Sequence, residues 1–411
     1  MTNRTLILII AILLVVGSII YLEAGKNRIS ISNNPSGSDI PVEVTVQNTA
    51  QETASSSAPR PSPSPISSNP PPPPKPVSIS DRVQTKQSKF PRVKEISSPD
   101  GFINTNEGFK LADVVGKKVI LVDFWTYSCI NCQRTTPYLN AWYEKYKNQG
   151  FEIVGIHTPE FEFEKNYQNV LNAVHDEHIQ YPVVLDNDYS TWTAYENRFW
   201  PRRYLIDIDG FIVFDQIGEG GYDVMERQIQ LALAERSLVL GSAQIIAGGM
   251  VNPNTGKDAP SEGSISRETY FGASRNEFLV NGSRGVTGEQ TFTDSSDVQS
   301  GGLYLAGTWN VTSEYAENKT ANAKIKFRYR AKNVYFVASA AQAMNVKILR
   351  DGKPLSAAEA GEDVKLVNGE ALMSVKEDQL YKLIHESAVT EHTLEIIIPN
   401  PGLRAFTFTF G

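Results

Sequence analysis

The chain has 411 residues, enough for two or three domains that each bury a hydrophobic core, so a single small module is excluded. Its 39 Lys and Arg residues against 46 Asp and Glu residues give a formal net charge of −7, so no overall basic field favours nucleic acid as the main partner. Only two cysteines are present, and they lie too close together to link distant segments as a disulfide scaffold.

The first predicted element is an apolar segment from Thr5 to Leu22, which carries no charged residue in 18 positions. At 1.5 Å per residue, a helix of this length just crosses the hydrocarbon core of a bilayer. The exit sequence, Glu23 and Ala24 included, offers a poor cleavage site, so we expect a single uncleaved transmembrane anchor. A cleaved signal peptide and a buried core helix remain alternatives.

Residues 23–94 are predicted to form a disordered linker rich in Pro and Ser, with a proline run from Pro70 to Pro74. Too few large apolar residues are present to bury a core. Pro-rich composition favours extended conformations, so this segment should act as a semi-rigid spacer. A ligand for proline-reading domains is the alternative.

Residues 95–240 show the alternation of buried strands and amphipathic helices that is typical of an α/β domain. The first two strands and the helix between them form a βαβ unit with parallel strands and a right-handed crossover. Asp209 and Gly210 mark the turn of a later hairpin. The predicted strands are 118–124, 152–157, 204–208 and 211–215, and the predicted helices are 130–148, 163–179 and 224–237.

Cys129 and Cys132 form a CxxC motif where the first strand becomes the first helix. The helix N-terminus stabilises a thiolate at the first position, so we predict that Cys129 attacks and that Cys132, one turn later, resolves the mixed disulfide. A zinc site is the alternative, but it needs four ligands and no further cysteine exists, so no metal is expected. His157, His175 and His178 are the only other candidate ligands near this motif.

The string VDFWTYSCINC resembles the thioredoxin fold, and more narrowly the membrane-anchored TlpA-like thiol-disulfide oxidoreductases. The resemblance implies that Asp123 is buried beneath the cysteines and accepts the proton of the resolving thiol. It implies that Pro137 kinks the active-site helix, and that Pro201 forms a cis peptide bond with Trp200 opposite the disulfide. It implies no cofactor other than the cysteine pair.

Two features depart from ordinary thioredoxins. Ile130 and Asn131 separate the cysteines in place of Gly-Pro, at positions that affect the reduction potential. Thr126 and Cys129 form a TxxC pattern that resembles peroxiredoxins, but Val122 stands where those proteins have a proline. Thiol peroxidase activity therefore remains an alternative.

Polar and aromatic residues beside the motif are candidates for tuning the thiols. His157 and Glu160 follow the second strand, so they should lie at the same carboxyl edge of the sheet as the cysteines. We expect these two residues, together with Trp125 and Trp200, to adjust thiol reactivity. The alternative is a polar loop without that role.

Residues 262–411 change to a period of two, as in the half-buried strand AKIKFRYR at 323–330. Further strands are predicted at 334–338, 345–350, 380–385, 393–398 and 405–410, with no convincing helix between them. This pattern predicts an all-β sandwich of the jelly-roll type. Trp309, Tyr304 and Tyr315 form either a sugar-stacking platform or part of the core.

The strings RETYFGASRNEF, LAGTWNV and PGLRAFTFTFG resemble the C-terminal half of DipZ-family proteins. In that family a thioredoxin-like domain precedes a β-sandwich similar to carbohydrate-binding modules, and the resemblance covers residues 95–411. Family members commonly carry a multi-helix electron-transferring membrane domain, whereas one anchor is expected here. Electrons would therefore come from a separate membrane protein.

Together these patterns predict a membrane-anchored, extracytoplasmic thiol-disulfide oxidoreductase at the bacterial cell surface or in the periplasm. We expect it to act reductively on protein disulfides. A cell-wall glycan-binding protein with an accessory redox domain and a thiol peroxidase are the alternatives.

Overall fold

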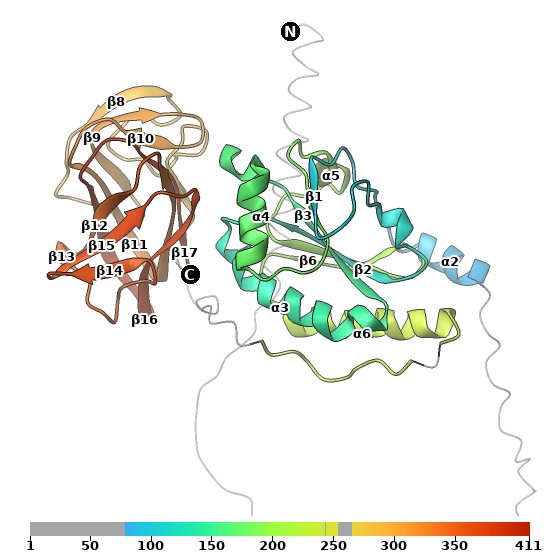
Figure 1. Ribbon diagram of the computed structural model, residues 1–411. Coiled ribbons are helices and arrows are strands. Elements are labelled where there is room, and N and C mark those ends of the chain that lie inside the picture. Colours follow the sequence, from blue (N-terminus) through green and yellow to red (C-terminus); the bar gives the residue numbers. More distant parts are fainter. Residues whose placement is uncertain (1–78, 243, 254–264) are drawn as a thin grey trace, which may run out of the picture. The chain divides into compact units, whose positions relative to one another are not determined.

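The computed structural model describes residues 79–242, 244–253 and 265–411, which all fall in one compact unit (Figure 1). The predicted anchor at residues 5–22 and most of the predicted linker lie outside the described residues. Within the described ranges, no helix combines the length and the apolar character needed to cross a membrane. We refer to residues 79–253 as the α/β domain and to residues 265–411 as the β domain.

The α/β domain is built on a six-stranded sheet in the order β1-β4-β3-β2-β5-β6 (Figure 1). Strands β2, β3 and β4 are parallel, β1 and β5 run antiparallel to them, and β6 pairs antiparallel with β5. The strands are β1 (Gly101–Ile103), β2 (Val119–Trp125), β3 (Phe151–His157), β4 (Val183–Leu185), β5 (Arg202–Ile206) and β6 (Ile212–Ile217). The α-helices are α2 (Ile79–Gln87), α3 (Ile130–Tyr146), α4 (Tyr167–Asp176), α5 (Ser190–Ala194) and α6 (Tyr222–Val239), and the short 3₁₀ helices are η2 (Leu111–Asp113), η3 (Lys147–Gln149) and η4 (Glu162–Lys165).

Strand β2 is buried at all seven positions because both faces of the sheet are covered. Side chains alternate between the faces. Leu121 belongs to the cluster that contains apolar residues of α3, α4 and α6, whereas Val122 belongs to the cluster with η2 and the end of α5. Figure 1 shows α3 and α6 side by side, and the hydroxyl of Tyr146 on α3 donates to Glu226 on α6 at 2.8 Å.

The predicted strands and helices of this domain occur in the predicted order, but one predicted helix is divided, and α5, β1 and β4 were not predicted. The segment predicted as one helix at 163–179 is divided at Asn166, whose side chain accepts the N–H groups of Gln168 and Asn169 and caps α4. Strands β1 and β4 were missed because three residues are too few to show a periodicity.

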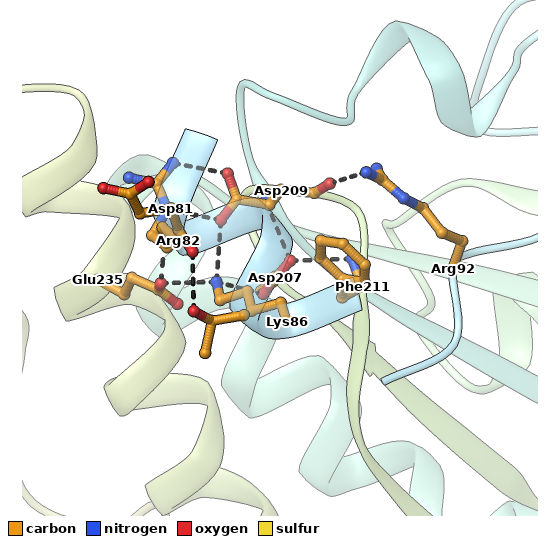
Figure 2. Close-up of polar contacts among 9 residues, drawn as sticks. Asp81, Arg82, Lys86, Arg92, Asp207, Asp209, Phe211 and Glu235 are labelled. Carbon is orange, nitrogen blue, oxygen red and sulfur yellow. Dashed lines mark hydrogen bonds and ion pairs between the residues drawn. The ribbon is translucent and has the colours of Figure 1, made fainter. Parts of the chain in front are cut away.

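Helix α2 shows that the linker prediction is wrong at its C-terminal end. Arg82 binds Asp209 through two hydrogen bonds of 2.7 Å, and Lys86 Nζ lies 2.5 Å from Asp207, 2.9 Å from Asp209 and 2.6 Å from Glu235 (Figure 2). The carboxylates are more than 120 positions away in sequence. Local composition does not reveal these distant carboxylates, so the composition of the segment predicted disorder.

The chain remains attached after α2. Arg92 Nη1 donates to the carbonyl oxygen of Asp209 at 3.0 Å, and its guanidinium lies 4.2 Å from the ring centroid of Phe211 (Figure 2). Because β5 is antiparallel to β2, the turn after β5 lies at the edge of the sheet opposite to the carboxyl end of β2. Helix α2 is thus held at the edge far from the CxxC motif.

Strands are the only regular secondary structure among the described residues of the β domain, so the prediction of an all-β domain is confirmed. The described strands form one antiparallel set of eleven. They are β7 (Thr269–Tyr270), β8 (Gly288–Phe292), β9 (Leu303–Val311), β10 (Ala316–Asn318), β11 (Ala323–Ala340), β12 (Met344–Arg350), β13 (Lys353–Pro354), β14 (Val364–Val367), β15 (Glu370–Val375), β16 (Gln379–Ile398) and β17 (Leu403–Phe410).

Four of the predicted strands are parts of two long strands in the structure. The predictions at 323–330 and 334–338 are both part of β11, and those at 380–385 and 393–398 are both part of β16. Irregular register around Lys332 shifts the alternation of side chains, so the periodicity seemed to break there. The first half of β11 pairs with β9 and the second half with β17.

The proposed sugar-stacking platform is not present. Trp309 is fully buried and its Nε1 donates to the carbonyl oxygen of Ala306, while Tyr304 is only 5% exposed. Tyr315 packs its ring against Phe406. Trp309 and Tyr304 belong to the core and Tyr315 is half-buried, because side chains on the inward face of a strand serve packing more often than binding.

The ionic cluster around α2 gives a testable prediction. We expect Lys86→Met to lower the free energy of unfolding by about 2 kcal/mol, because it leaves carboxylates in a largely buried cluster without their shared cation. Lys89→Met, on an exposed position just after the same helix, is the control and should have little effect. Urea unfolding of both variants tests this, and equal stability of the two would contradict it.

Candidate functional site

The two cysteines lie at the start of α3, as predicted. Cys129 is the N-cap residue, with an extended backbone, and its Sγ accepts the backbone N–H of Cys132 at 3.4 Å. Cys129 is partly exposed, Cys132 is only 2% exposed, and both are free thiols. An external molecule can therefore reach Cys129, whereas Cys132 is accessible mainly to its neighbour.

Burial raises the pKa of Cys132 well above its ordinary value, and the adjacent Cys129 raises it further. Cys132 therefore stays protonated near neutral pH. A reaction that uses its thiolate needs a nearby base to remove this proton.

The buried carboxyl group of Asp123 is the candidate for that base. It lies on β2, is 2% exposed, and contributes to the electrostatic environment of Cys132. Burial raises the pKa of Asp123 from 3.8 to about 7, although the positive charge of Arg203 acts in the opposite direction. A carboxyl group with this pKa exchanges a proton readily at neutral pH.

Arg203 is a site residue that the sequence reasoning missed. It lies directly opposite Asp123 on the neighbouring strand β5 and is fully buried. Its Nη2 donates to the carbonyl oxygens of Gly218 at 2.6 Å and Gly220 at 3.2 Å, and the ring of Tyr222 lies 5.4 Å from the guanidinium. Directly opposed side chains share one face of a sheet, so Arg203 is the counter-charge of Asp123.

The sequence did contain a signal for Arg203. It stands in the middle of a strand whose next three residues are all buried, where an unpaired charge is costly. Arg202, the preceding residue, faces the other way and pairs with Asp215 at 2.7 Å. Only the strand register identifies which of the two arginines faces Asp123.

The peptide bond between Trp200 and Pro201 is cis, as the resemblance implied. The carbonyl oxygen of Trp200 lies 4.0 Å from Cys129 Sγ, so this loop borders the attacking thiol. The indole of Trp200 is held by a 3.0 Å hydrogen bond to the carbonyl oxygen of Thr158 and by contact with the ring of Trp192.

His157 lies behind the CxxC loop rather than on the surface. It is fully buried, and burial lowers its pKa to about 3, so the imidazole is neutral near pH 7. Its ring stacks on Tyr127 at a centroid distance of 5.8 Å and meets the edge of Trp125 at 5.1 Å. Any influence of His157 on the thiols at neutral pH is therefore exerted through packing and polarity, without a charge.

Glu160 and Glu164 bind different partners. Glu160 Oε1 accepts hydrogen bonds from Tyr270 at 2.9 Å and from Arg275 at 2.6 Å, both in the β domain, and its influence on the thiols stays a prediction. Glu164, which the sequence reasoning missed, is fully buried and accepts from the hydroxyl of Ser128 at 2.6 Å and from the N–H of Phe161 at 3.0 Å. It fixes the loop directly before Cys129.

The β domain packs on Ile130, one of the two residues between the cysteines. Ile130 is 3% exposed because it joins an apolar cluster that includes Phe161 of the α/β domain and Tyr335 and Phe406 of the β domain. The hydroxyl of Tyr127 donates to the carbonyl oxygen of Asp378 at 3.2 Å. The CxxC motif is thus bordered by both domains.

Comparisons with known proteins agree with this arrangement. Residues 92–215 match the model of the AhpC/TSA family, and residues 266–411 match that of the thioredoxin-like C-terminal domain. The thiol-disulfide oxidoreductase ResA of Bacillus cereus is 33% identical over 135 residues, which cover 32% of this chain and 75% of ResA. The chain belongs to the thioredoxin-like family of ResA.

Two further relatives extend the comparison. Protein DipZ of Mycobacterium bovis is 34% identical over 315 residues, which cover 76% of this chain. The DipZ-like order of domains predicted from the sequence is thereby confirmed, and this chain spans 41% of the length of DipZ. The thiol-disulfide oxidoreductase YkuV of Bacillus subtilis is 29% identical over 122 residues, which cover 30% of this chain and 82% of YkuV.

The raised pKa of Asp123 makes stability depend on pH. Folding disfavours the ionised carboxylate. The resulting loss in the free energy of unfolding is therefore absent below about pH 4, grows as pH rises, and is complete above about pH 7. The rise from 3.8 to about 7 corresponds to about 4 kcal/mol, a figure that already includes the opposing charge of Arg203, and the buried donors of an Asn amide offset part of it. We therefore expect Asp123→Asn to raise the free energy of unfolding by about 2 kcal/mol at pH 8 and by little at pH 4. Denaturant unfolding of the dithiol form tests this, and an equal gain at both pH values would contradict it.

The role of Arg203 as a counter-charge is tested separately. Arg203→Met removes the positive charge that lowers the pKa of Asp123, so this pKa should rise further above about 7. Carboxyl-carbon NMR titration of Asp123 measures it directly. Arg202→Met is the matched control, because it removes the same charge from the next position of β5 while leaving the residue opposite Asp123 intact. Equal shifts in the two variants would refute the assignment.

Proposed function

We propose that the protein is a thiol-disulfide oxidoreductase that uses the Cys129/Cys132 pair and acts reductively on disulfides of other proteins. The observation that supports this most strongly is the pairing of a reachable thiol at a helix N-terminus with a buried thiol above a carboxyl group whose pKa is about 7. Membership of the family that includes ResA agrees with this chemistry.

The reaction runs in two exchanges. The Cys129 thiolate attacks one sulfur of the substrate disulfide, forms a mixed disulfide and releases the other substrate sulfur as a thiolate, which takes up a proton from water. Asp123 then accepts the proton of Cys132, and the Cys132 thiolate attacks Cys129 Sγ. A Cys129–Cys132 disulfide forms, the bond between Cys129 and the substrate breaks, and the second substrate sulfur leaves as a thiolate that takes up the proton released by Asp123. The substrate gains two electrons and the protein loses two.

The oxidised pair must be reduced again by an external dithiol donor, and we propose a separate membrane electron-transfer protein for this step. The apolar segment at residues 5–22 supports an anchor that holds the catalytic part outside the cytoplasm. We propose a bacterial cell-surface or periplasmic location on this basis.

The two alternative functions have less support. Thr126, which a peroxidase would use to orient peroxide, is fully buried, with its hydroxyl 3.4 Å from His157 Nε2. A glycan-binding protein would need exposed stacking aromatics, and Trp309 is in the core. Neither alternative is therefore proposed.

Cysteine variants test the proposed reaction. We expect the wild-type dithiol form to reduce a protein disulfide, Cys129→Ser to abolish this, and Cys132→Ser to accumulate a mixed disulfide at Cys129 that is visible by mass spectrometry. Asn131→Ala, which changes the motif but keeps both thiols, is the control and should retain turnover. A wild-type protein that oxidises dithiols but reduces no disulfide would contradict the reductive direction, and full activity of Cys129→Ser would contradict the reaction itself.

A further inference from the structure

A cavity of about 300 Å³ lies where the CxxC helix contacts the β domain. Ile130 and Arg134 of α3 form one wall, and Asn333, Tyr335, Lys382 and Ile384 of the β domain contribute to the others. This volume lies at the lower end of the range for ligand sites. The cavity is distinct from the contact between Cys129 and the Trp200 loop.

The cavity borders the attacking thiol through Ile130. This residue directly follows Cys129, and it is buried on the β-domain side of the motif. The lining of the cavity therefore begins at the residue next to the attacking cysteine, although Cys129 itself does not line it.

Two hydrogen-bond donors in the cavity wall lack acceptors. Arg134 Nε and Asn333 Nδ2 are buried and have no hydrogen-bond partner among the described residues. Both side chains are more than nine-tenths buried. Both atoms have almost no accessible surface, so an acceptor on a ligand reaches them only when the side chain turns toward the cavity; because a buried donor without an acceptor is costly, such a ligand favours that turn.

Other contacts hold these two side chains at the cavity wall. Arg134 donates to Glu219 at 3.2 Å and to the hydroxyl of Tyr335 at 3.1 Å. Asn333 Oδ1 lies 2.9 Å from His385 Nδ1. Arg134 and Asn333 therefore stay beside the cavity whether or not a ligand is bound.

The remaining lining matches an apolar side chain. Ile130, Ile384 and Ala360 supply aliphatic surface, and the charge of Lys382 is paired with that of Glu362 at the rim. Apolar walls with a few donors suit a polypeptide, which offers backbone carbonyl oxygens and side chains together.

We propose that this cavity is a substrate subsite that binds the polypeptide segment next to the substrate cysteine. The apolar side chain of that segment packs on Ile130 and Ile384, and a backbone carbonyl accepts from Asn333 Nδ2 or Arg134 Nε once that side chain turns toward the cavity. The subsite rests on the proposed function, since it acts on a substrate held at Cys129. The β domain is then part of substrate recognition, and the preferred substrates are polypeptide disulfides with an apolar residue beside the cysteine.

The first test fills the cavity. Ala360→Leu adds bulk to its wall, and Ala358→Leu adds the same bulk at an exposed position two residues earlier as the matched control. Rates are measured with insulin, a polypeptide disulfide, and with bis(2-hydroxyethyl) disulfide, which has no polypeptide to bind. We expect Ala360→Leu to lower the ratio of kcat/KM for insulin to kcat/KM for the small disulfide by about tenfold or more. Ala358→Leu should leave this ratio at its wild-type value.

The outcomes are distinct. An unchanged ratio in Ala360→Leu, or an equal loss with both disulfides, would overturn the subsite while the proposed function stands. A wild-type protein that reduces neither disulfide would overturn the proposed function and the subsite with it.

The second test locates the bound segment without relying on turnover or on a cavity variant. Cys132→Ser traps a mixed disulfide between Cys129 and a peptide with one cysteine and a neighbouring benzophenone-bearing residue. After illumination, mass spectrometry should find cross-links on β11 near Tyr335 or on β16 near Lys382 and Ile384. Cross-links confined to the α/β domain, for example at Trp192 or Trp200, would overturn the proposal.

Discussion

A charge inside a fully buried strand is the constraint on which the redox centre depends. Strand β2 is covered on both faces, yet it carries Asp123, which acts electrostatically on Cys132. Such a charge is costly to bury, and Arg203 on β5 reduces the cost by lying opposite it. The compromise leaves the pKa of Asp123 at about 7, so one carboxyl group can accept and release a proton at neutral pH. Lower burial would remove this property, and an absent arginine would leave the carboxyl group protonated at neutral pH.

Buried polar contacts also position the motif itself. Cys129 caps α3. Glu164 fixes the loop before it by accepting a hydrogen bond from Ser128. The ring of the neutral His157 stacks on Tyr127 in the same loop. Neither of these groups touches the sulfur atoms in the contacts described, but together they limit how the attacking thiol can move. Rigid support of this kind is what a reactive group needs for repeated exchange with large substrates.

The β domain gives this thioredoxin-like centre a second border. Ile130 lies between the cysteines, where ordinary thioredoxins have Gly-Pro, and here it is buried against strands of the other domain. Phe161 packs against Phe406, and the adjacent Glu160 binds Arg275, so the contact combines apolar and ionic parts. Trp309 and Tyr304, which resembled part of a sugar platform, instead lie in the core of that domain. The contribution of the β domain to the site comes from side chains of the central strands β11, β16 and β17 that pack on Ile130.

Periodicity and motif spacing are local properties of the chain, and they were enough to predict the α/β order, the all-β C-terminal region and the place of Cys129 and Cys132 at the start of a helix. The family resemblance implied the burial of Asp123 and the cis bond before Pro201. The folded chain alone shows which arginine faces Asp123, that Glu164 holds the loop, that α2 is ordered by distant carboxylates, and that Ile130 is buried by another domain. Each of these depends on partners far apart in sequence, brought together by strand register and domain contact, and no local pattern records such pairings.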